Sequence, residues 1–427
     1  MTSLNRRDFI NSTAALAAAT FVSGASEARA NARQRVRVAV MGVRSRGRQL
    51  IENYSHFDWV DFAYLCDADT QYMPEAAKAI TAKGRKEPKM VQDFRAALDD
   101  PEVDVLICAA PNHWHGLATI LACQAGKDVY VEKPVSHNIG EGRRMVEAAR
   151  KYKRIVQSGT QRRSGADFQE AIDLLKQGRI GEVRLAKTWI NGGRPNIGYE
   201  EVVDPPESLD FNLWCGPAPN NGYKKNLVPY NWHWRWDYGG GECANNGIHG
   251  LDLARWGMGM EYPETIVSGG NKYVFDDDQQ TPDTQMATFD FPGGAIHWEH
   301  YTWSKMTQEG EGFGVMFYGT EGTLFCRSGG WSIYNKDNKE VEKRESAERD
   351  RAHILNFLEC LETRSLPNAD IEIGHRSAAL CHLANIAIRT RSTITYDGEK
   401  ETILDNEPAQ ALLNREPRSG FEYPTLA

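Results

Sequence analysis

The chain has 427 residues, enough for two or three domains of ordinary size. Hydrophobic residues make up 41% and charged residues 25%, a balance that excludes a disordered chain, a collagen-like chain and a polytopic membrane protein. Its 58 Asp and Glu outnumber its 50 Lys and Arg, and the formal charge of −8 predicts neither a nucleic-acid nor a membrane partner. Eight Cys occur without a C-x-x-C pair, which excludes a zinc ribbon and a thioredoxin-type motif.

Residues 1–30 have the features of an export signal. The pair Arg6-Arg7 is followed by a short apolar run, 14–22, and by a small-x-small cleavage sequence at 28–30. The run is too short to span a bilayer, which needs roughly 20 apolar residues. The three signals in this order predict a twin-arginine leader and export of the folded protein to the periplasm. The alternative is an Ala-rich helical extension with an accidental Arg pair.

The cysteines are expected to be buried thiols. An oxidising destination permits disulfides. However, Cys66 and Cys108 lie in strand-like apolar runs, whereas Cys360 and Cys381 lie on apolar helix faces. These positions favour free thiols in the core for most of the eight.

From residue 36 to about 158, apolar runs alternate with amphipathic stretches. This alternation is typical of βαβ units and predicts an α/β domain with a parallel sheet. The strand-like runs are 36–41, 62–66, 103–108, 128–131 and 155–157, and the helical patterns between them include 117–125 and 142–151.

Residues 159–427 follow a different pattern. A helix at 167–177 and a strand at 183–190 precede a long stretch rich in Pro, Gly, Asn and Trp, which ends near residue 241. Several strand-like runs then follow without intervening helices, which predicts an α+β domain with a mostly antiparallel sheet. These runs are 265–268, 285–291, 295–301, 313–318 and 322–327, and helices at 350–362 and 374–389 close the chain.

A Gly-rich loop at 42–47 directly follows the first strand and opens a helix, where a Rossmann domain binds the phosphates of a dinucleotide. Arg44 replaces the middle Gly of the G-x-G-x-x-G fingerprint, so the loop alone is a weak signal. Asp67 strengthens it, because an acidic residue at the end of the second strand can accept both ribose hydroxyls of NAD. This Asp would repel a 2′-phosphate and favours NAD, while Arg44 leaves NADP open. The expected loop contacts are Gly42, Arg44, Ser45, Arg46 and Gly47.

Two further loops follow later strands of the same sheet. Pro111, Asn112 and His115 come after the 103–108 run, at the edge where doubly wound sheets bind ligands. Glu132 and Lys133 end the next strand and precede a proline, which fixes the backbone and places the amine at the rim of the cleft. Such a Lys can hold a substrate hydroxyl and move its proton during hydride transfer. The alternative is a solvated Lys in a turn.

The loop at 42–47, the Ala-Pro-Asn-x-x-His sequence at 110–115 and the Glu-Lys-Pro sequence at 132–134 together resemble the Gfo/Idh/MocA family. This family includes glucose–fructose oxidoreductase and inositol dehydrogenase, and the resemblance covers nearly the whole chain after the leader. It implies a second domain built on a large open, mostly antiparallel sheet. Since a large apolar sheet face seldom stays bare, we expect a homo-oligomer formed through that sheet.

The resemblance extends to a second motif, G-G-G-x-x-x-D-x-G-x-H-x-x-D, which lies at 239–252. His249 and Asp252 match it, whereas Asn245 replaces the family aspartate. The resemblance implies that positions 245 and 249 surround the reacting carbinol together with Lys133, and i,i+4 residues share one face of an α-helix. An amide cannot relay a proton as a carboxylate does. We therefore expect Lys133 and His249 to do the acid–base work and Asn245 to orient a hydroxyl; the alternative for His249 is a structural role.

An aromatic segment, 230–238, immediately precedes this motif. Its Trp residues at alternating positions resemble a strand face, for which core packing is the default explanation. Interleaved polar residues beside the candidate catalytic helix favour a carbohydrate-binding wall instead. Metal binding by His297 and His300 is rejected because alternation on a strand separates them, so no metal is expected. The expected substrate contacts are Trp232, His233, Trp234, Arg235, Asp252 and, at the domain junction, Arg163.

These features predict an NAD(P)-dependent oxidoreductase that transfers a hydride between nicotinamide and a carbinol of a sugar or sugar derivative. The periplasm holds no soluble NAD pool, so the cofactor is expected to stay tightly bound. Two alternatives remain, a redox-neutral NAD-dependent glycosidase that works by oxidation and elimination, and a non-catalytic sugar-binding protein. The Glu-Lys-Pro sequence favours the oxidoreductase, and the presence of Lys133 and His249 disfavours the non-catalytic protein.

Overall fold

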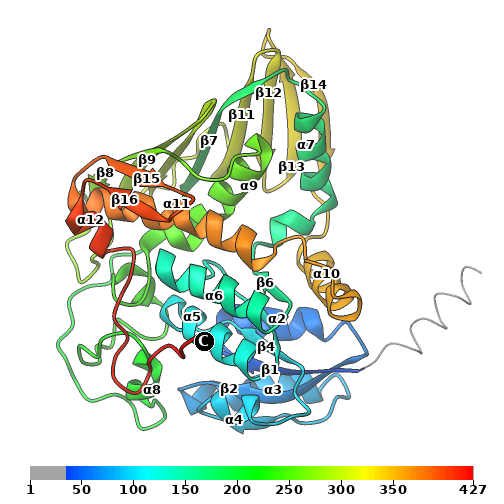
Figure 1. The fold of residues 1–427 in the computed structure, drawn as a ribbon, viewed down its shortest axis with the longest axis vertical. Helices are drawn as coiled ribbons and strands as arrows, with labels where there is room; N and C mark the ends of the chain where they lie inside the picture. Colours follow the sequence, from blue (N-terminus) through cyan, green and yellow to red (C-terminus); the bar gives the residue numbers. More distant parts are fainter. Residues whose placement is uncertain (1–34, 427) are drawn as a thin grey trace, which may run out of the picture.

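The computed structural model describes residues 35–426. The expected leader at residues 1–30 lies outside the described residues. Figure 1 shows two sheets, one at each end of the molecule, with helices between them. The expected combination of a parallel-sheet domain and a mostly antiparallel one is confirmed.

The first sheet has six parallel strands in the order β3-β2-β1-β4-β5-β6. The strand order reverses between β1 and β4, and doubly wound sheets bind ligands at such a point, beyond the carboxyl ends of the strands. The central strands are buried along their whole length because helices cover both faces, and apart from Asp128 at the start of β5 the residues of β4 and β5 are apolar. The strands are β1 (Val36–Met41), β2 (Val60–Cys66), β3 (Lys89–Val91), β4 (Val105–Cys108), β5 (Asp128–Val131) and β6 (Val156–Ser158).

The helix that follows β4 begins earlier than its apolar pattern predicted. Residues 112–116 carry Asn and His side chains that mask the apolar period, yet most of this helix is buried around its whole circumference. The next helix is amphipathic and is capped by Asn138, whose side chain accepts a hydrogen bond from the Glu141 amide at 2.9 Å. The helices of this half are α2 (Ser45–Tyr54), α3 (Met73–Thr81), α4 (Arg95–Leu98), α5 (Asn112–Gln124) and α6 (Ile139–Lys151).

The second sheet has ten strands in the order β14-β13-β12-β11-β7-β10-β9-β8-β15-β16. The pair β7 and β10 is parallel, while the other pairs are antiparallel. The strands are β7 (Val183–Asn191), β8 (Thr265–Asn271), β9 (Thr284–Phe291), β10 (Gly294–Tyr301), β11 (Phe313–Gly319), β12 (Gly322–Arg327), β13 (Gly330–Asn335), β14 (Glu340–Glu345), β15 (Ile394–Asp397) and β16 (Thr402–Leu404).

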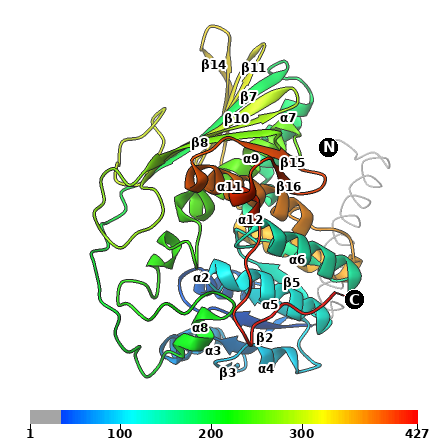
Figure 2. The ribbon, with the colours of Figure 1, turned by 60° about the vertical axis from the view of Figure 1, so that its left-hand side comes forward.

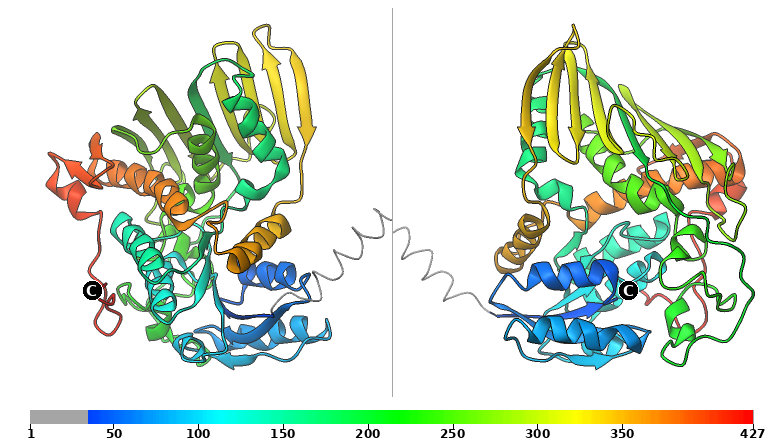
Figure 3. Two further views of the ribbon diagram at one scale, coloured as in Figure 1. Left: turned by 45° about the vertical axis from the view of Figure 1, so that its right-hand side comes forward. Right: turned by 180° about the vertical axis from the view of Figure 1, so that it is seen from behind.

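Helices cover only one face of this sheet in the described part of the chain. Figures 2 and 3 show α7 (Ala166–Lys176), α9 (Ile248–Met258) and α11 (Ile371–Thr390) on the face that is turned toward the first domain. Along β9, Ala287 and Phe289 point toward these helices and are buried, whereas Met286 on the opposite face is 43% exposed. The sheet is therefore open on its outer side.

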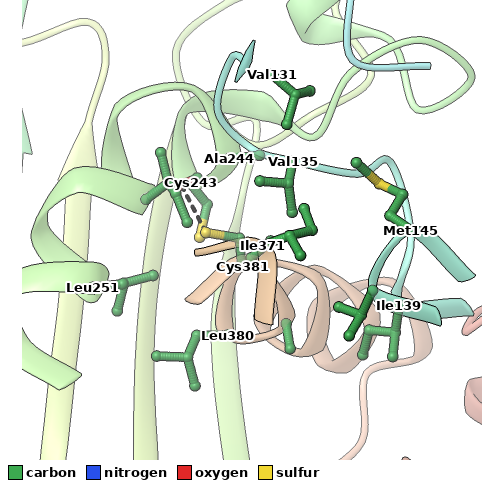
Figure 4. Close-up of a cluster of buried hydrophobic side chains, with 14 of the residues drawn as sticks. Val131, Val135, Ile139, Met145, Cys243, Ala244, Leu251, Ile371, Leu380 and Cys381 are labelled. Atoms are coloured by element: carbon green, nitrogen blue, oxygen red, sulfur yellow. Dashed lines mark hydrogen bonds between the residues drawn. The ribbon is translucent and has the colours of Figure 1, made fainter. Parts of the chain in front are cut away.

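The two halves share a continuous core. Figure 4 shows Val135 of the first half beside Ile371 of α11, and Ile139 and Leu380 belong to the same buried cluster. The helix α10 (Asp350–Thr363) returns to the first domain, where Phe357 packs edge-to-face on Tyr130 with ring centroids 6.0 Å apart. The two sheets are thereby held together around the cleft between them.

The eight cysteines are all buried and unbridged, as their positions predicted. Burial raises the pKa of the Cys215 thiol to about 11. The remaining α-helices, α8 (Phe211–Cys215) and α12 (Glu407–Ala411), are short. None of the helices formed by residues 35–426 combines the length and the apolar character that crossing a membrane requires.

Candidate active site

A cavity of about 300 Å³ opens at the carboxyl ends of the first sheet. The loops that follow β1, β2, β4 and β5 form one wall, and residues between 213 and 245 form the other. Every residue predicted to contact the cofactor lines it except Gly47. Those that do are Gly42, Arg44, Ser45, Arg46, Asp67, Pro111, Asn112, His115, Glu132 and Lys133.

Two glycines let the loop after β1 pass close to its neighbours. Gly42 has φ +82°, and a Cβ there would lie 2.6 Å from the Ala109 carbonyl oxygen. A Cβ at Gly47 would lie 1.8 Å from the Gly42 carbonyl oxygen, so this residue serves close packing rather than ligand contact. No side chain caps the N-terminus of α2, and its first turn carries no acidic residue, so this end of the helix favours the approach of an anion.

Asp67 is held in place by the backbone around it. One carboxylate oxygen accepts from the Val43 amide at 3.0 Å and the other from the Asp69 amide, also at 3.0 Å. Burial raises the pKa of Asp67, and these two amides partly oppose the rise. Since each carboxylate oxygen can accept more than one hydrogen bond, the side chain retains capacity for ribose hydroxyls. Across the cavity mouth, the Arg44 guanidinium lies over the Tyr72 ring, 4.9 Å from its centroid.

Arg46 lines the cavity, but its guanidinium is already bound to protein carboxylates. Its Nε donates to Glu132 Oε1 at 2.8 Å, and its Nη2 donates to Asp350 Oδ1 at 2.7 Å. These contacts connect α2, the end of β5 and α10. Arg46 therefore holds the Glu132 carboxylate in place in this structure. Its place in the Gly-rich loop did not indicate this role.

Lys133 reaches across the cleft to the second domain. Its Nζ donates to the backbone oxygen of Asn245 at 2.5 Å and lies 3.4 Å from the Asn245 side-chain oxygen. Burial lowers the pKa of Lys133, while the charges of Glu132 and Glu242 oppose that effect. Lys133 therefore loses its proton more readily than a solvated lysine, as a group that exchanges protons with a hydroxyl requires.

His115 fixes the loop that carries Lys133. Its ring nitrogens lie 2.6 Å from the Pro134 carbonyl oxygen and 2.8 Å from the Ala110 carbonyl oxygen. Burial lowers the pKa of His115, and a neutral imidazole donates to only one of these acceptors at a time. The side chain thus connects the loop after β4 to the loop after β5 and positions Lys133.

Asn245 lies in a π-helical turn, Cys243–Gly247, that runs into α9. The regular α-helix expected to carry both residues 245 and 249 begins only at Ile248, because Cys243–Gly247 forms the wider turn of a π-helix. Asn245 lines the cavity and His249 does not. The Nδ1 of His249 is buried without a hydrogen-bond partner, and burial together with the charge of Lys133 lowers its pKa well below the usual value.

Glu242 and Arg194 complete this side of the site and escaped prediction. The Arg194 Nη2 lies 3.1 and 3.2 Å from the two Glu242 oxygens, and its Nη1 donates to the Tyr230 hydroxyl at 3.1 Å. Glu242 is buried and also accepts from the Asn245 amide nitrogen at 3.5 Å. Glu242 could have been found from the sequence, because it is an acidic residue directly after a run of three glycines. Arg194 lies in a long loop without any local pattern.

Arg163 and Asp252 form a buried ion pair away from the cavity lining, which contradicts their predicted contact with substrate. The Arg163 Nε lies 2.9 Å from both Asp252 oxygens, and the Ser377 hydroxyl donates to Asp252 at 2.6 Å. Both charged side chains are at most 5% exposed. The pair fastens the 3₁₀ turn η2 (Gln161–Ser164), which follows β6, to α9.

The Trp-rich segment is not a strand, because it has no neighbouring strand to pair with and Asn231–Trp234 forms a 3₁₀ turn, η3. Trp232 and His233 line the cavity, with ring centroids 3.6 Å apart in a stacked pair. Trp234 and Arg235 do not line it, and Arg235 instead forms an ion pair with Asp278 at 3.1 Å. Only part of the predicted carbohydrate-binding wall therefore faces the site.

The segment before η3 forms a roof over the cavity. It is attached to the loop after β2, since the Thr70 amide donates to the Ser208 carbonyl at 2.9 Å and the Asp210 amide donates to the Ala68 carbonyl at 2.9 Å. The C-terminal tail contacts it as well, since the Arg418 Nε donates to the Gly216 carbonyl at 3.0 Å and the Arg418 amide donates to the Pro217 carbonyl at 3.1 Å. Roof residues that line the cavity are Leu213, Trp214, Val228 and Pro229.

Two family models match the chain. The one described as an oxidoreductase family NAD-binding Rossmann fold covers residues 36–160, and the one described as the C-terminal α/β domain of that family covers residues 187–423. The chain belongs to the Gfo/Idh/MocA oxidoreductase family. Its cofactor is NAD. Gly42 and Gly47 let the backbone come close to this dinucleotide, and Asp67 can accept hydrogen bonds from its ribose hydroxyls.

Solved structures share this Gfo/Idh/MocA fold at low identity. The WlbA dehydrogenase from Bordetella pertussis, in complex with NADH and UDP-GlcNAcA, matches with a TM-score of 0.65 and 21% identity over 85% of this chain and 99% of that one. A levoglucosan dehydrogenase in complex with NADH and levoglucosan gives 0.68 and 15% over 86% and 100%. The aldose-aldose oxidoreductase from Caulobacter crescentus gives 0.64 and 20% over 85% and 100%.

Among curated proteins, this Gfo/Idh/MocA chain is similar to members of glycosyl hydrolase family 109. The protein from Shewanella pealeana is 26% identical over 152 residues, which are 35% of this chain and 33% of the relative. A second, from Shewanella sp. strain ANA-3, is 28% identical over 205 residues, 43% of this chain and 45% of the relative. The match thus spans less than half the length of these relatives.

Proposed function

We propose that this protein transfers a hydride between a tightly held NAD and a carbinol carbon of a sugar or sugar derivative. The contact between Lys133 and Asn245 carries the proposal, because it places a buried amine of lowered pKa at the end of the dinucleotide cavity. The bound nicotinamide supplies the hydride acceptor or donor. The chain supplies the proton transfer and the geometry.

The proton has a defined route in this arrangement. Oxidation of a carbinol removes a hydride from its carbon and a proton from its hydroxyl, and the proton passes to Lys133 Nζ. Reduction of a carbonyl uses the same amine in reverse as a donor. The Asn245 amide, held by Glu242, orients the hydroxyl, and His249, four residues further along the chain, is kept neutral by its lowered pKa.

A sugar is favoured by the aromatic part of the wall. Tyr230, Trp232 and His233 line the cavity next to Asn245, and aromatic faces with a few polar groups are typical of small-molecule pockets. Solved neighbours of the same fold include a levoglucosan dehydrogenase and an aldose-aldose oxidoreductase.

The curated relatives favour a second candidate, a redox-neutral glycosidase that oxidises its substrate transiently, eliminates the glycosidic oxygen and then restores the nicotinamide. The residues described above serve both reactions. They differ in the product, because the glycosidase releases a free sugar without net change in the cofactor.

Three further properties belong to the proposal. The twin-arginine pattern in residues 1–30 supports export to the periplasm. The roof over the cavity supports a cofactor that stays bound during turnover. The outer face of the second sheet exposes Leu185, Val267 and Met286, at 37%, 53% and 43%, and supports a homo-oligomer formed through that face.

The test is a screen of free sugars and glycosides followed at the nicotinamide absorbance of the purified protein. We expect bound NAD to be reduced by a free sugar and reoxidised by a ketose or lactone. Release of a free sugar from a glycoside without net NADH would select the glycosidase. A protein that neither carries nor binds NAD would contradict both.

A further inference from the structure

The His233 imidazole is held in one orientation on the wall of the cavity. Its ring stacks on Trp232 with centroids 3.6 Å apart and an angle of 21° between the two planes. The Tyr230 ring lies on it as well, at 4.5 Å between centroids. Its Nδ1 lies 2.6 Å from the Tyr230 carbonyl oxygen. These contacts leave the ring little freedom to turn.

The contact with Tyr230 also determines where the imidazole carries its proton. A carbonyl oxygen can only accept, so Nδ1 must be the protonated nitrogen. Burial lowers the pKa of His233 to about 3, and the charges of Lys133 and Arg194 contribute, although the bond to Tyr230 opposes the change. Near neutral pH the ring is therefore uncharged, and its Nε2 carries a lone pair and no proton.

This Nε2 is open to a ligand. It has no hydrogen-bond partner among residues 35–426, and it is not enclosed by protein. The His233 side chain is half-buried and lines the cavity. The Nδ1 edge of the ring faces the backbone and one flat face is covered by Trp232. The edge that carries Nε2 is the part that remains for the cavity.

A chain of contacts connects His233 to the reacting position. The Tyr230 hydroxyl, on the ring beside the imidazole, accepts from Arg194 at 3.1 Å. Arg194 pairs with Glu242 at 3.1 Å, and Glu242 accepts from the Asn245 amide at 3.5 Å. Asn245 in turn accepts from the amine that exchanges the hydroxyl proton. The imidazole therefore belongs to the substrate end of the cavity.

The other acceptors at this end are already in use. Both Glu242 oxygens accept from Arg194, and one of them also accepts from Asn246. The Asn245 side-chain oxygen lies 3.4 Å from Lys133 Nζ. The imidazole Nε2 is thus an acceptor that the described residues leave for a ligand.

We infer that His233 Nε2 accepts a hydrogen bond from a second hydroxyl of the sugar, beyond the one that Lys133 deprotonates, and selects substrates in which this hydroxyl is free. A substrate that fills the cavity displaces solvent from Nε2, so it must supply a donor or leave the acceptor unpaired. A hydroxyl can donate, whereas a deoxy carbon, a fluorine or an alkylated oxygen cannot. This inference rests on the proposed function and narrows its substrate class.

The experiment removes the donor from one sugar position at a time. The probes are D-glucose, D-galactose and D-mannose, as free sugars and as methyl glycosides, with their 2-, 3-, 4- and 6-deoxyfluoro derivatives. Calorimetric titration of the NAD-loaded protein gives the affinities, and the nicotinamide absorbance gives turnover. We expect fluorine at one position other than the reacting carbon to weaken binding by about 10- to 100-fold. Equal affinity of the parent and all such derivatives would overturn the inference.

The variant His233→Phe keeps a flat ring on Trp232 and removes the acceptor. It should bind the parent sugar about 10- to 100-fold more weakly, and the sensitive fluoro derivative should bind it no worse than the parent does. His233→Gln should restore part of the affinity, because its amide oxygen can accept. His297→Phe is the matched control, since His297 is also half-buried and bonds to Thr288 on the second sheet, away from the cavity.

Two results would assign His233 another role. If His233→Phe weakens the parent and every fluoro derivative by the same factor, the ring serves packing alone. If it removes a limb from the pH dependence of turnover, His233 exchanges protons instead of accepting a hydrogen bond. We expect the same pH dependence in the variant and in the unchanged protein, because the neutral imidazole keeps its proton on Nδ1 throughout.

The outcomes separate this inference from the proposed function. If a parent sugar reduces the bound NAD and the fluoro derivatives respond alike with and without His233, the oxidoreductase stands and the hydroxyl contact is wrong. If no sugar or glycoside binds or changes the nicotinamide, the proposed function is wrong as well.

Discussion

The two ends of the cavity are assembled in different ways. At the cofactor end, Gly42 and Asp67 directly follow strands of one parallel sheet and Pro111 lies in the loop after a third, so the sheet alone brings them together. At the substrate end, Lys133 meets Asn245 of the second domain, which contacts Glu242, only because the two halves pack against each other. The first end depends on short stretches of sequence, and the second depends on the whole fold.

The largest expected effect is at the contact between the two ends. Lys133→Ala should lower turnover by about 10²–10⁴-fold, because no other amine is in place to exchange the hydroxyl proton. The bound nicotinamide should remain, since the loop at Gly42 and Asp67 is untouched. Steady-state turnover and cofactor content check this. Lys127→Met, which removes another buried lysine of the same domain, should retain activity; equal losses in both variants would contradict the assignment.

The substrate end also depends on an ion pair that contacts no substrate. Arg163→Met should lower the free energy of unfolding by about 3–5 kcal/mol, because it leaves the Asp252 carboxylate buried without its cation. Denaturant unfolding followed by tryptophan fluorescence measures the change. Where enough folded protein remains, KM for the sugar should be nearly unchanged. A large rise in KM with normal stability would instead support the substrate contact that the sequence suggested.

This division explains what could be predicted from the sequence. The parallel sheet and the Gly42 loop were predictable, because apolar runs and turn residues act over a few positions. The π-turn at Asn245 and the position of Arg194 were not, because each depends on packing between distant segments. The alternating Trp residues from 232 to 236 suggested a strand, yet a strand needs a partner that no local pattern reveals.

The cofactor end can be perturbed by itself. Asp67→Ala should weaken NAD binding by about 10- to 100-fold, the usual effect of losing hydrogen bonds to a charged group. The pH dependence of turnover at saturating NAD should stay as it was, because Asp67 lies far along the cavity from Lys133. Calorimetric titration of protein stripped of cofactor gives the affinity. Asp61→Ala is the matched control on the same strand, since Asp61 pairs with Arg35 at the surface. A similar loss there would indicate a general effect on the sheet.

The substrate end should show a pH dependence set by charges of both domains. Oxidation needs neutral Lys133, so turnover should rise with pH through the lowered pKa of this amine. Glu132 and Glu242 raise that pKa, whereas Arg46 and Arg194 lower it. Glu242→Gln should therefore move the rising limb to lower pH, and Arg194→Gln should move it to higher pH, each by about one unit. Shifts of both variants in one direction would contradict this electrostatic account.

The smallest expected effect is a difference in KM between variants of the two buried tryptophans of the aromatic segment. Trp232 lines the cavity and stacks on His233, whereas Trp234 packs behind it near Arg194. Trp232→Phe should raise KM for the sugar about three- to tenfold, because the smaller ring covers less of the sugar face. Trp234→Phe should leave KM unchanged and lower stability slightly. Steady-state kinetics on both variants measure the two KM values. Equal KM values would mean that neither ring contacts the substrate. The substrate end of the cavity would then be bounded by Lys133, Asn245 and the polar groups beside them.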